Sequence, residues 1–232
     1  LRNTILYNLV FIVLGMVVSV GLAIMISLMR NKRASKVYQT MMFFPYFMSW
    51  VVASYFLDAF LNQNNGLINN MLRNSGQQPI QWYMTAGAWP AILTFMYLWK
   101  STGYNMVIYL SSISGIDTTL YEAAVMDGAN KRQQVFHITL PCLKNVIIMM
   151  FILNVGKIFY SDFGLFYQLS QGASGSIFKT TATIDTYIYN ALRSSTIGMT
   201  SAAAFFQSVA CCITIIFANA IVKKFDEDSA II

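Results

Sequence analysis

Charged side chains are scarce in this sequence. Lys, Arg, Asp and Glu make up 10% of the 232 residues and hydrophobic types make up 56%, whereas an ordinary soluble domain carries about 25% charged residues. This shortage argues against a soluble domain and indicates a membrane protein. The net charge of +6 does not indicate nucleic-acid binding, because the basic residues flank apolar runs and form no continuous tract.

The residue types that build metal sites and disulfide frameworks are also rare. There is one histidine, His137, and there are three cysteines, Cys142, Cys211 and Cys212. An odd number of cysteines, two of them adjacent, provides neither a disulfide framework nor a metal-ligand spacing. A single imidazole without partner ligands is better interpreted as an interfacial or packing residue. The G-x-x-x-x-G-K-[S/T] phosphate loop is also missing, so P-loop binding of ATP by this chain is excluded.

Long apolar runs dominate what is present. A membrane-spanning helix needs about 20 mainly apolar residues, and several runs reach this length. The sequence therefore predicts an all-α, polytopic membrane bundle in a single domain over 1–232, with five spans at 5–29, 41–61, 86–110, 146–168 and 201–222. The fourth of these is apolar only as far as Gly156.

The basic residues divide unequally between the two sides that five alternating spans would create. Nine lie on one side: Arg30, Lys32, Arg33, Lys36, Lys131, Arg132, Lys144, Lys223 and Lys224. The other side holds Arg2, Arg73, Lys179 and Arg193. Because cytoplasmic loops carry the excess of Lys and Arg, we expect a multi-pass protein of the bacterial plasma membrane with a cytoplasmic C-terminus. Loops 62–85 and 169–200 would then face outward.

A polar segment, YEAAVMDGANKRQQVFHITLP at 121–141, interrupts the apolar runs. Thr119 stands three residues before Glu122, the spacing of a capping box in which each side chain satisfies a free backbone N–H of the first helical turn. A short helix is therefore predicted to begin near Leu120. Gly128 can end it by adopting the left-handed conformation.

A second short helix is predicted directly after this glycine. Asn130 and Gln133 have the residue types and spacing that cap a helix N-terminus, and Pro141 restricts the chain before the next span. The product is a helical hairpin over about 117–141, which the charge distribution places at the cytoplasmic face.

The chemistry of the hairpin favours docking over catalysis. Glu122 and Asp127 are five residues apart, so they share a helical face poorly and make no convincing acid/base pair. Ala123 and Ala124 would instead present a smooth surface that another protein can approach closely. The two carboxylates remain available to cationic groups of that protein.

One family pattern matches these residues. Glu122, Ala123, Ala124, Gly128, Ile138, Leu140 and Pro141 resemble the EAA motif of permease subunits of binding-protein-dependent ABC importers. The wording YEAAVMDGA followed by HITLP resembles the carbohydrate-uptake type, and WKSTGYNMVIYLSSISGID resembles its subgroup for complex saccharides and uronate-containing oligosaccharides. The resemblance covers essentially the whole chain and implies that one further span precedes Leu1.

The resemblance also implies a mechanism. In such permeases the hairpin is a coupling helix that docks on a cytoplasmic ATPase, and the matching contact residues here are Glu122, Ala123, Ala124, Asp127 and Gly128. The chain would then be no enzyme, because ATP and Mg²⁺ would be bound by two partner ATPase subunits. A second, homologous permease and an extracytoplasmic solute-binding protein would complete an importer that moves a saccharide across the lipid bilayer by alternating access.

Polar residues inside predicted spans mark a candidate substrate pathway, because they are costly in a membrane. They form two groups: Lys100, Tyr104 and Asn105, and Asn154, Lys157, Tyr160, Ser161 and Asp162. Amide, hydroxyl and ammonium groups beside aromatic rings suit a sugar, and a lysine suits a uronate carboxylate. The alternatives are that Lys100 extends toward the membrane interface and that Lys157 pairs with Asp162 or a neighbouring subunit.

Three other functions remain open from the residues. A permease for peptides or amino acids is the nearest alternative, disfavoured by the DGA and ITLP wording. An ion-coupled secondary transporter would show inverted repeats with broken helices, and no clear repeat is seen. A purely structural membrane subunit would not explain polar residues at depth.

Overall fold

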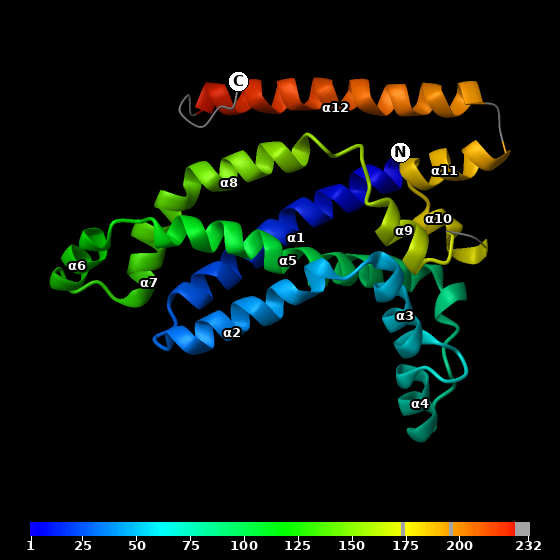
Figure 1. Ribbon diagram of the computed structural model, residues 1–232, viewed down its shortest axis with the longest axis horizontal. Helices are drawn as coiled ribbons and strands as arrows, with labels where there is room; N and C mark the ends of the chain where they lie inside the picture. Colours follow the sequence, from blue (N-terminus) through cyan, green and yellow to red (C-terminus); the bar gives the residue numbers. More distant parts are fainter. Residues whose placement is uncertain (173–174, 195–196, 226–232) are drawn as a thin grey trace. The chain divides into compact units, whose positions relative to one another are not determined.

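The computed structural model describes residues 1–172, 175–194 and 197–225, and within these ranges every regular element is a helix (Figure 1). The prediction of an all-α membrane bundle is confirmed. The predicted cytoplasmic tail after Phe225 lies outside the described residues, as do 173–174 and 195–196 in the predicted outward loop 169–200.

Three helices of the described chain are both long and apolar enough to cross a membrane: Arg2–Ser27 (α1), Lys131–Val155 and Ile197–Lys224, which belongs to α12 (Ile197–Phe225). A fourth span is reached if the broken pair Lys32–Phe47 and Trp50–Leu61 counts as one. Helix α5 (Trp89–Ser114) has 26 residues, about 39 Å at 1.5 Å per residue. It is long enough, but Lys100, Ser101 and Asn105 interrupt its apolar surface. The count of five spans stays a prediction.

The predicted span 146–168 was wrong in its extent. Helix α8 (Leu140–Val155) ends at Gly156, and a new short helix, α9 (Phe163–Leu169), begins after Asp162. The Asp162 carboxylate accepts a hydrogen bond from the Leu165 backbone N–H at 3.3 Å, which makes it the N-cap of α9. The predicted span is therefore interrupted between Val155 and Phe163, and Asp162 starts the second helix.

The continuous helix instead begins at Lys131. Helix α7 (Lys131–Gln134) enters α8 through a π-helical turn, Val135–Thr139. This wider turn lies directly before Pro141, whose missing N–H and bulky ring would otherwise disturb a regular α-helix. Pro141, predicted to restrict the chain before the next span, therefore lies within one continuous helix, Lys131–Val155.

The predicted span 41–61 is also divided. Helix α2 (Lys32–Phe43) passes into the 3₁₀ turn Phe44–Phe47, and α3 (Trp50–Leu61) starts after Ser49, whose hydroxyl caps it by accepting from the Val52 N–H at 3.2 Å. Pro45 removes one backbone donor and restricts the residue before it, which favours a break at this point.

The chain divides into two compact units. Unit 1 comprises 1–11, 47–98 and 157–212, and unit 2 comprises 12–46, 99–156 and 213–232, described as far as Phe225. The nine basic residues predicted for the cytoplasmic side all belong to unit 2, and the four predicted for the outside all belong to unit 1. The charge pattern and the packing therefore divide the chain in the same way.

The core of unit 2 joins three helices. Val20, Ala23 and Ile26 of α1 pack with Met106, Tyr109 and Ile113 of α5 and with Leu143 of α8. The Ser19 hydroxyl donates to the Thr102 carbonyl at 3.5 Å across α1 and α5. Gly103 lets the backbone of α5 approach α2, because a β-carbon at this position would overlap the Met42 carbonyl.

The core of unit 1 is aromatic. Phe11 of α1 stacks on Tyr97 of α5 with ring centroids 4.0 Å apart, and Tyr7 meets Phe166 of α9 edge-on at 4.9 Å. The remaining short elements of the unit are α4 (Leu67–Asn74), the 3₁₀ turns Trp82–Met84, Ala86–Ala88 and Gly175–Ile177, α10 (Phe178–Thr181) and α11 (Ile184–Ser194).

Candidate functional site

The polar hairpin forms in unit 2, and its first helix is α6 (Thr118–Met126). Asp117 caps this helix, because its carboxylate accepts from the Thr119 backbone N–H at 2.9 Å. The same hydrogen bond lowers the pKa of Asp117 below its ordinary value. The predicted capping box of Thr119 and Glu122 was wrong: the chain offers two cap residues two positions apart, and the aspartate takes the role.

The turn of the hairpin is built around Gly128, which has φ +79° and is left-handed as predicted. The Ala129 N–H donates to the Ala124 carbonyl at 2.8 Å and the Gly128 N–H donates to the Val125 carbonyl at 3.0 Å. These two bonds are the pair that defines a Schellman motif. The helix therefore ends in a fixed conformation that only glycine adopts without strain.

The second leg starts with the predicted capping box. The Gln133 N–H donates to the Asn130 side chain at 3.0 Å, and the Asn130 N–H donates to the Gln133 side chain at 2.7 Å. Gln134 is buried and donates to the Ala129 carbonyl at 3.0 Å. The start of the second helix is therefore held to the turn by a side chain as well as by the backbone.

A further bond holds the hairpin to the helix that follows it. The Tyr121 hydroxyl lies 2.9 Å from the Thr139 hydroxyl, with Tyr121 on α6 and Thr139 in the π-helical turn before α8. This contact joins α6 to the turn that leads into α8.

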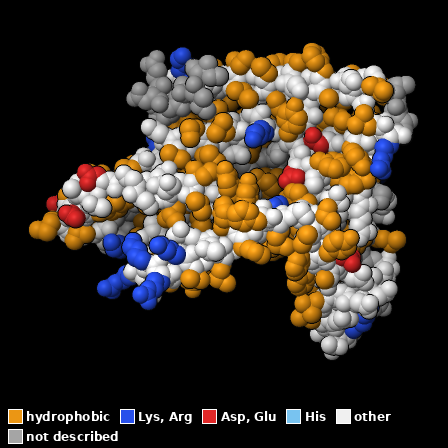
Figure 2. Space-filling view, in the orientation of Figure 1, with side chains coloured by type: hydrophobic (Ala, Val, Ile, Leu, Met, Phe, Trp, Pro, Cys, Tyr) orange, Lys and Arg blue, Asp and Glu red, His pale blue; other side chains and the backbone are white. Residues whose placement is uncertain are grey.

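Most of the predicted docking residues are accessible to a partner. Glu122, Ala123, Asp127 and Gly128 are exposed and Ala124 is half-buried. Two apolar side chains accompany them, since Val125 is 55% exposed and Met126 is 87% exposed. Figure 2 shows acidic side chains over α6 and Lys and Arg side chains over the start of α2. The hairpin therefore offers an acidic and apolar tip to a partner.

Sequence reasoning missed Val125 and Met126. The sequence did contain a signal for them, because they are an apolar pair inside a loop that the charge pattern places in water. Exposed apolar groups of this kind mark interaction surfaces.

Two of the three predicted pathway residues in the first group, Lys100 and Tyr104, contact a residue that sequence reasoning missed. Lys100 donates to the Tyr46 carbonyl at 2.7 Å, and its ammonium lies 5.4 Å from the centroid of the Tyr46 ring. Tyr104 stacks on the same ring at 4.6 Å, with an interplanar angle of 12°. Asn105 is half-buried on α5. The pair Tyr46 and Tyr104, each about two-fifths exposed, thus forms an aromatic surface beside a cation.

The residues of the second group are divided between the two units, and those described next each have their own surroundings. Asn154 donates back to the Met150 carbonyl of its own helix at 2.6 Å, and Lys157 is exposed beyond the end of α8. Tyr160 lies 3.0 Å from the Ser208 hydroxyl. Asp162 accepts from the Trp50 indole at 2.6 Å in addition to capping α9. Lys157 was predicted to lie inside the span 146–168, but α8 ends at Val155, so Lys157 lies outside that helix.

Together these features define a class of protein: a polytopic helical membrane protein with an exposed polar hairpin that is capped at both helix starts. The chain matches the family described as "Binding-protein-dependent transport system inner membrane component" over residues 2–227. It therefore belongs to this family, as its motif predicted.

Relatives and solved structures agree with this assignment. The Bacillus subtilis (strain 168) "Polygalacturonan/rhamnogalacturonan transport system permease protein YteP" is 30% identical over 98% of this chain and 70% of its own length. The "Lactose transport system permease protein LacF" of Rhizobium radiobacter is 32% identical over 82% of this chain and 63% of its own. A chain of the "bacterial alginate ABC transporter in complex with alginate pentasaccharide-bound periplasmic protein" has a TM-score of 0.90 and 28% identity, covering 97% of this chain and 77% of that one.

Proposed function

We propose that the chain is a membrane-spanning subunit of an ATP-driven importer for saccharides, coupled to cytoplasmic ATPase subunits through the hairpin 117–141. One observation carries the proposal. The hairpin is capped at both helix starts, closed by a Schellman turn and hydrogen-bonded to the root of α8, while its tip is exposed. A stiff element with an exposed tip can transmit a push into a membrane helix, which a flexible loop cannot do.

The assembly proposed for this chain follows its family. A second homologous permease, two ATPase subunits that bind ATP and Mg²⁺, and an extracytoplasmic solute-binding protein would complete the importer. ATP hydrolysis belongs to the partners, so the chain itself is proposed to be no enzyme. The separation of nine and four basic residues between the two units supports a bacterial plasma-membrane orientation with the hairpin and C-terminus in the cytoplasm.

We propose an acidic oligosaccharide as the substrate. Two of the similar proteins carry polygalacturonan, rhamnogalacturonan or alginate in their names. The aromatic surface of Tyr46 and Tyr104 suits the apolar face of a sugar ring, and Lys100 beside it suits a carboxylate. Lys157, exposed at the end of α8, stays a proposed pathway residue.

Co-purification with candidate ATPase subunits tests the coupling proposal. Wild type is expected to retain the ATPase, while Gly128→Ala is expected to lose it, because a β-carbon in the left-handed conformation costs about 1–2 kcal/mol and displaces the tip. Gly76→Ala is the matched control: Gly76 is also left-handed at φ +75° with open space around it, but it lies in unit 1. Failure of wild type to recruit any ATPase would reject the coupling role, and equal losses in both variants would reject the hairpin as its site.

A further inference from the structure

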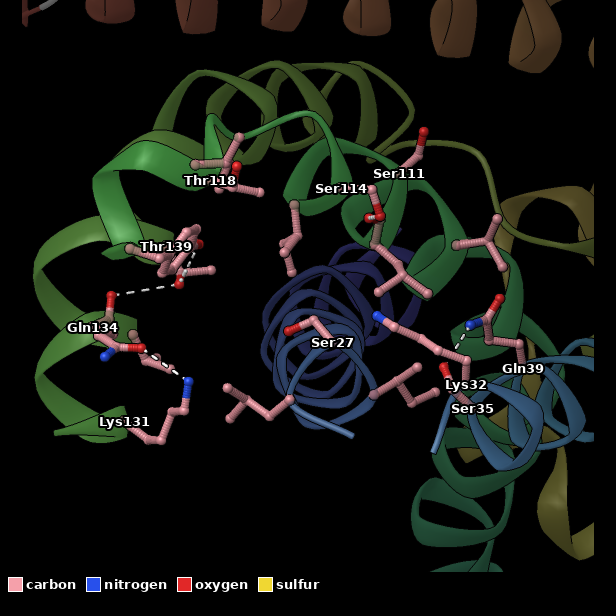
Figure 3. A pocket seen from close by; sticks show the side chains of 18 of the residues that line it. Ser27, Lys32, Ser35, Gln39, Ser111, Ser114, Thr118, Lys131, Gln134 and Thr139 are labelled. Atoms are coloured by element: carbon pink, nitrogen blue, oxygen red, sulfur yellow. Dashed lines mark hydrogen bonds between the residues drawn. The ribbon is translucent and has the colours of Figure 1, made fainter. Parts of the chain in front are cut away.

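A pocket of about 700 Å³ opens in unit 2 between the end of α1, the start of α2, the end of α5 and the hairpin (Figure 3). Three lysines line it: Lys32 and Lys36 from α2 and Lys131 from α7. Lys131 and Lys32 stand on opposite sides of the view in Figure 3, with Ser27 between them and with Ser114 and Thr118 above them. We refer to this cavity as the lysine pocket.

The charge of the lysine pocket has one sign. Among the described residues that line it, none is acidic. Lys131 donates to the Gln134 amide oxygen at 3.2 Å, a neutral acceptor that leaves the ammonium charge in place. Cations on facing walls repel one another unless an anion lies between them. The pocket is therefore built for a negatively charged group with several acceptor oxygens, such as a phosphate.

The rest of the lining is hydrocarbon. Val107, Leu110 and Ile113 follow one face of α5, and Ile26 and Leu28 continue this surface from α1. Val107 is the lining residue nearest the middle of α5, and it is partly exposed. The accessible apolar surface therefore extends from the lysines along α5 toward the middle of that helix. A small soluble anion would leave this surface unused, whereas a molecule with an anionic head and a hydrocarbon tail would cover both parts.

We propose that the lysine pocket binds an anionic phospholipid, with the phosphate of the head group between Lys32 and Lys131 and an acyl chain along Val107 and Leu110. Basic pockets between membrane helices on the cytoplasmic side bind such head groups. The location at the cytoplasmic surface rests on the orientation in the proposed function. A phosphate held by both lysines would join the hairpin to α2, so the bound lipid would brace the coupling element.

Native mass spectrometry of the full chain, released from nanodiscs of phosphatidylglycerol or phosphatidylcholine, measures the bound lipid directly. Wild type is expected to retain phosphatidylglycerol and not phosphatidylcholine. Each lysine near a membrane contributes about 1 kcal/mol, which is about fivefold in affinity. The variant Lys32→Gln/Lys131→Gln is therefore expected to bind phosphatidylglycerol roughly 30-fold more weakly.

The matched control is Lys223→Gln/Lys224→Gln, which removes the same charge from the last turn of α12, outside the pocket. Equal loss in both variants would overturn the proposal, because it would indicate diffuse attraction to the basic surface. Retention of the lipid by Lys32→Gln/Lys131→Gln would overturn it as well. Its unfolding temperature in phosphatidylcholine, where no head group is bound, shows whether that variant is folded.

Two further experiments, competition by inorganic phosphate and photolabelling, identify the ligand and its position. Inorganic phosphate that displaces phosphatidylglycerol at millimolar concentration would assign the pocket to a soluble anion and reject the lipid. A photoreactive acyl chain is expected to label the segment of α5 containing Val107 and Leu110, and labelling elsewhere would overturn the placement. Because no ATPase is present in these measurements, their outcome is independent of the co-purification test of the proposed function.

Discussion

Asp185 of α11 binds Ser161 twice, since its carboxylate accepts from the Ser161 backbone N–H at 2.7 Å and from the Ser161 hydroxyl at 2.6 Å. Gln207, buried on α12, donates to the same carboxylate at 3.2 Å and to the Phe159 carbonyl at 2.7 Å. One carboxylate therefore connects the segment after α8 with two helices. Ser161 was predicted as a pathway residue, and the structure gives it this anchoring contact.

Asp185→Ala is expected to destabilise unit 1 by about 2 kcal/mol, because it leaves part-buried donors without an acceptor. Thermal unfolding of the detergent-solubilised chain measures this change. Asp58→Ala is the matched control. The Asp58 side chain accepts one side-chain hydrogen bond, from Asn62 at 3.2 Å, so this substitution should lower the stability less. Equal decreases in the unfolding temperature of the two variants would show that the hydrogen bonds to Asp185 contribute no more to stability than the single bond to Asp58.

Gly103→Ala is expected to separate α2 from α5. The new methyl group would overlap the Met42 carbonyl, and backbone cannot move aside as a side chain can, so a cost of about 1–3 kcal/mol is expected. Gly21→Ala on α1 is the control, because nothing lies within 4 Å of its β-carbon position and alanine favours a helix by about 1 kcal/mol over glycine. The unfolding temperature should fall for Gly103→Ala and rise for Gly21→Ala. An equal decrease in both variants would contradict the close approach of α5 to α2.

The cap of α6 is expected to weaken in acid. The pKa of Asp117 is lowered in the folded chain by its hydrogen bond to Thr119, so its stabilisation is fully present above the ordinary carboxyl value of about 4 and is lost as the pH falls through the lowered value. Amide hydrogen exchange of the first turn of α6 should accelerate in this acidic range after correction for intrinsic rates. Asp117→Asn keeps a capping oxygen without titrating, so an identical acid response in that variant would refute the assignment.

The hairpin was predictable because its signals are local. Features that depend on contacts between distant residues could not be predicted from the sequence. Gly128 and the pair Asn130 and Gln133 act within a few residues, so their spacing alone indicates a turn and a cap. Tyr46 pairs with Tyr104 across 58 positions, and no periodicity links two such residues. The break between Val155 and Phe163 was missed because the apolar residues before Gly156 and after Asp162 were joined into one span, while the bond from Trp50 to Asp162 is visible only in the fold.

Lys100→Gln is expected to reduce uptake of an acidic oligosaccharide roughly 10- to 100-fold, because an ammonium–carboxylate hydrogen bond contributes about 1.5–3 kcal/mol. Uptake by the assembled importer in vesicles is measured with a uronate oligosaccharide and with a neutral one of equal length. A loss confined to the acidic substrate supports recognition of its charge. A parallel loss for both substrates would mean that Lys100 acts by holding Tyr46, to whose carbonyl it donates.

Met126→Ser is expected to weaken docking of the ATPase. The side chain is 87% exposed at the tip of the hairpin, and burying a methionine contributes about 1.5–3 kcal/mol, which corresponds to roughly 10- to 100-fold in affinity. The affinity is measured by titrating the purified chain with the ATPase. Met84→Ser provides the control, because Met84 is 66% exposed but belongs to unit 1. If Met126→Ser retains the ATPase as firmly as Met84→Ser does, the partner contacts the hairpin through its acidic residues and not through its apolar tip.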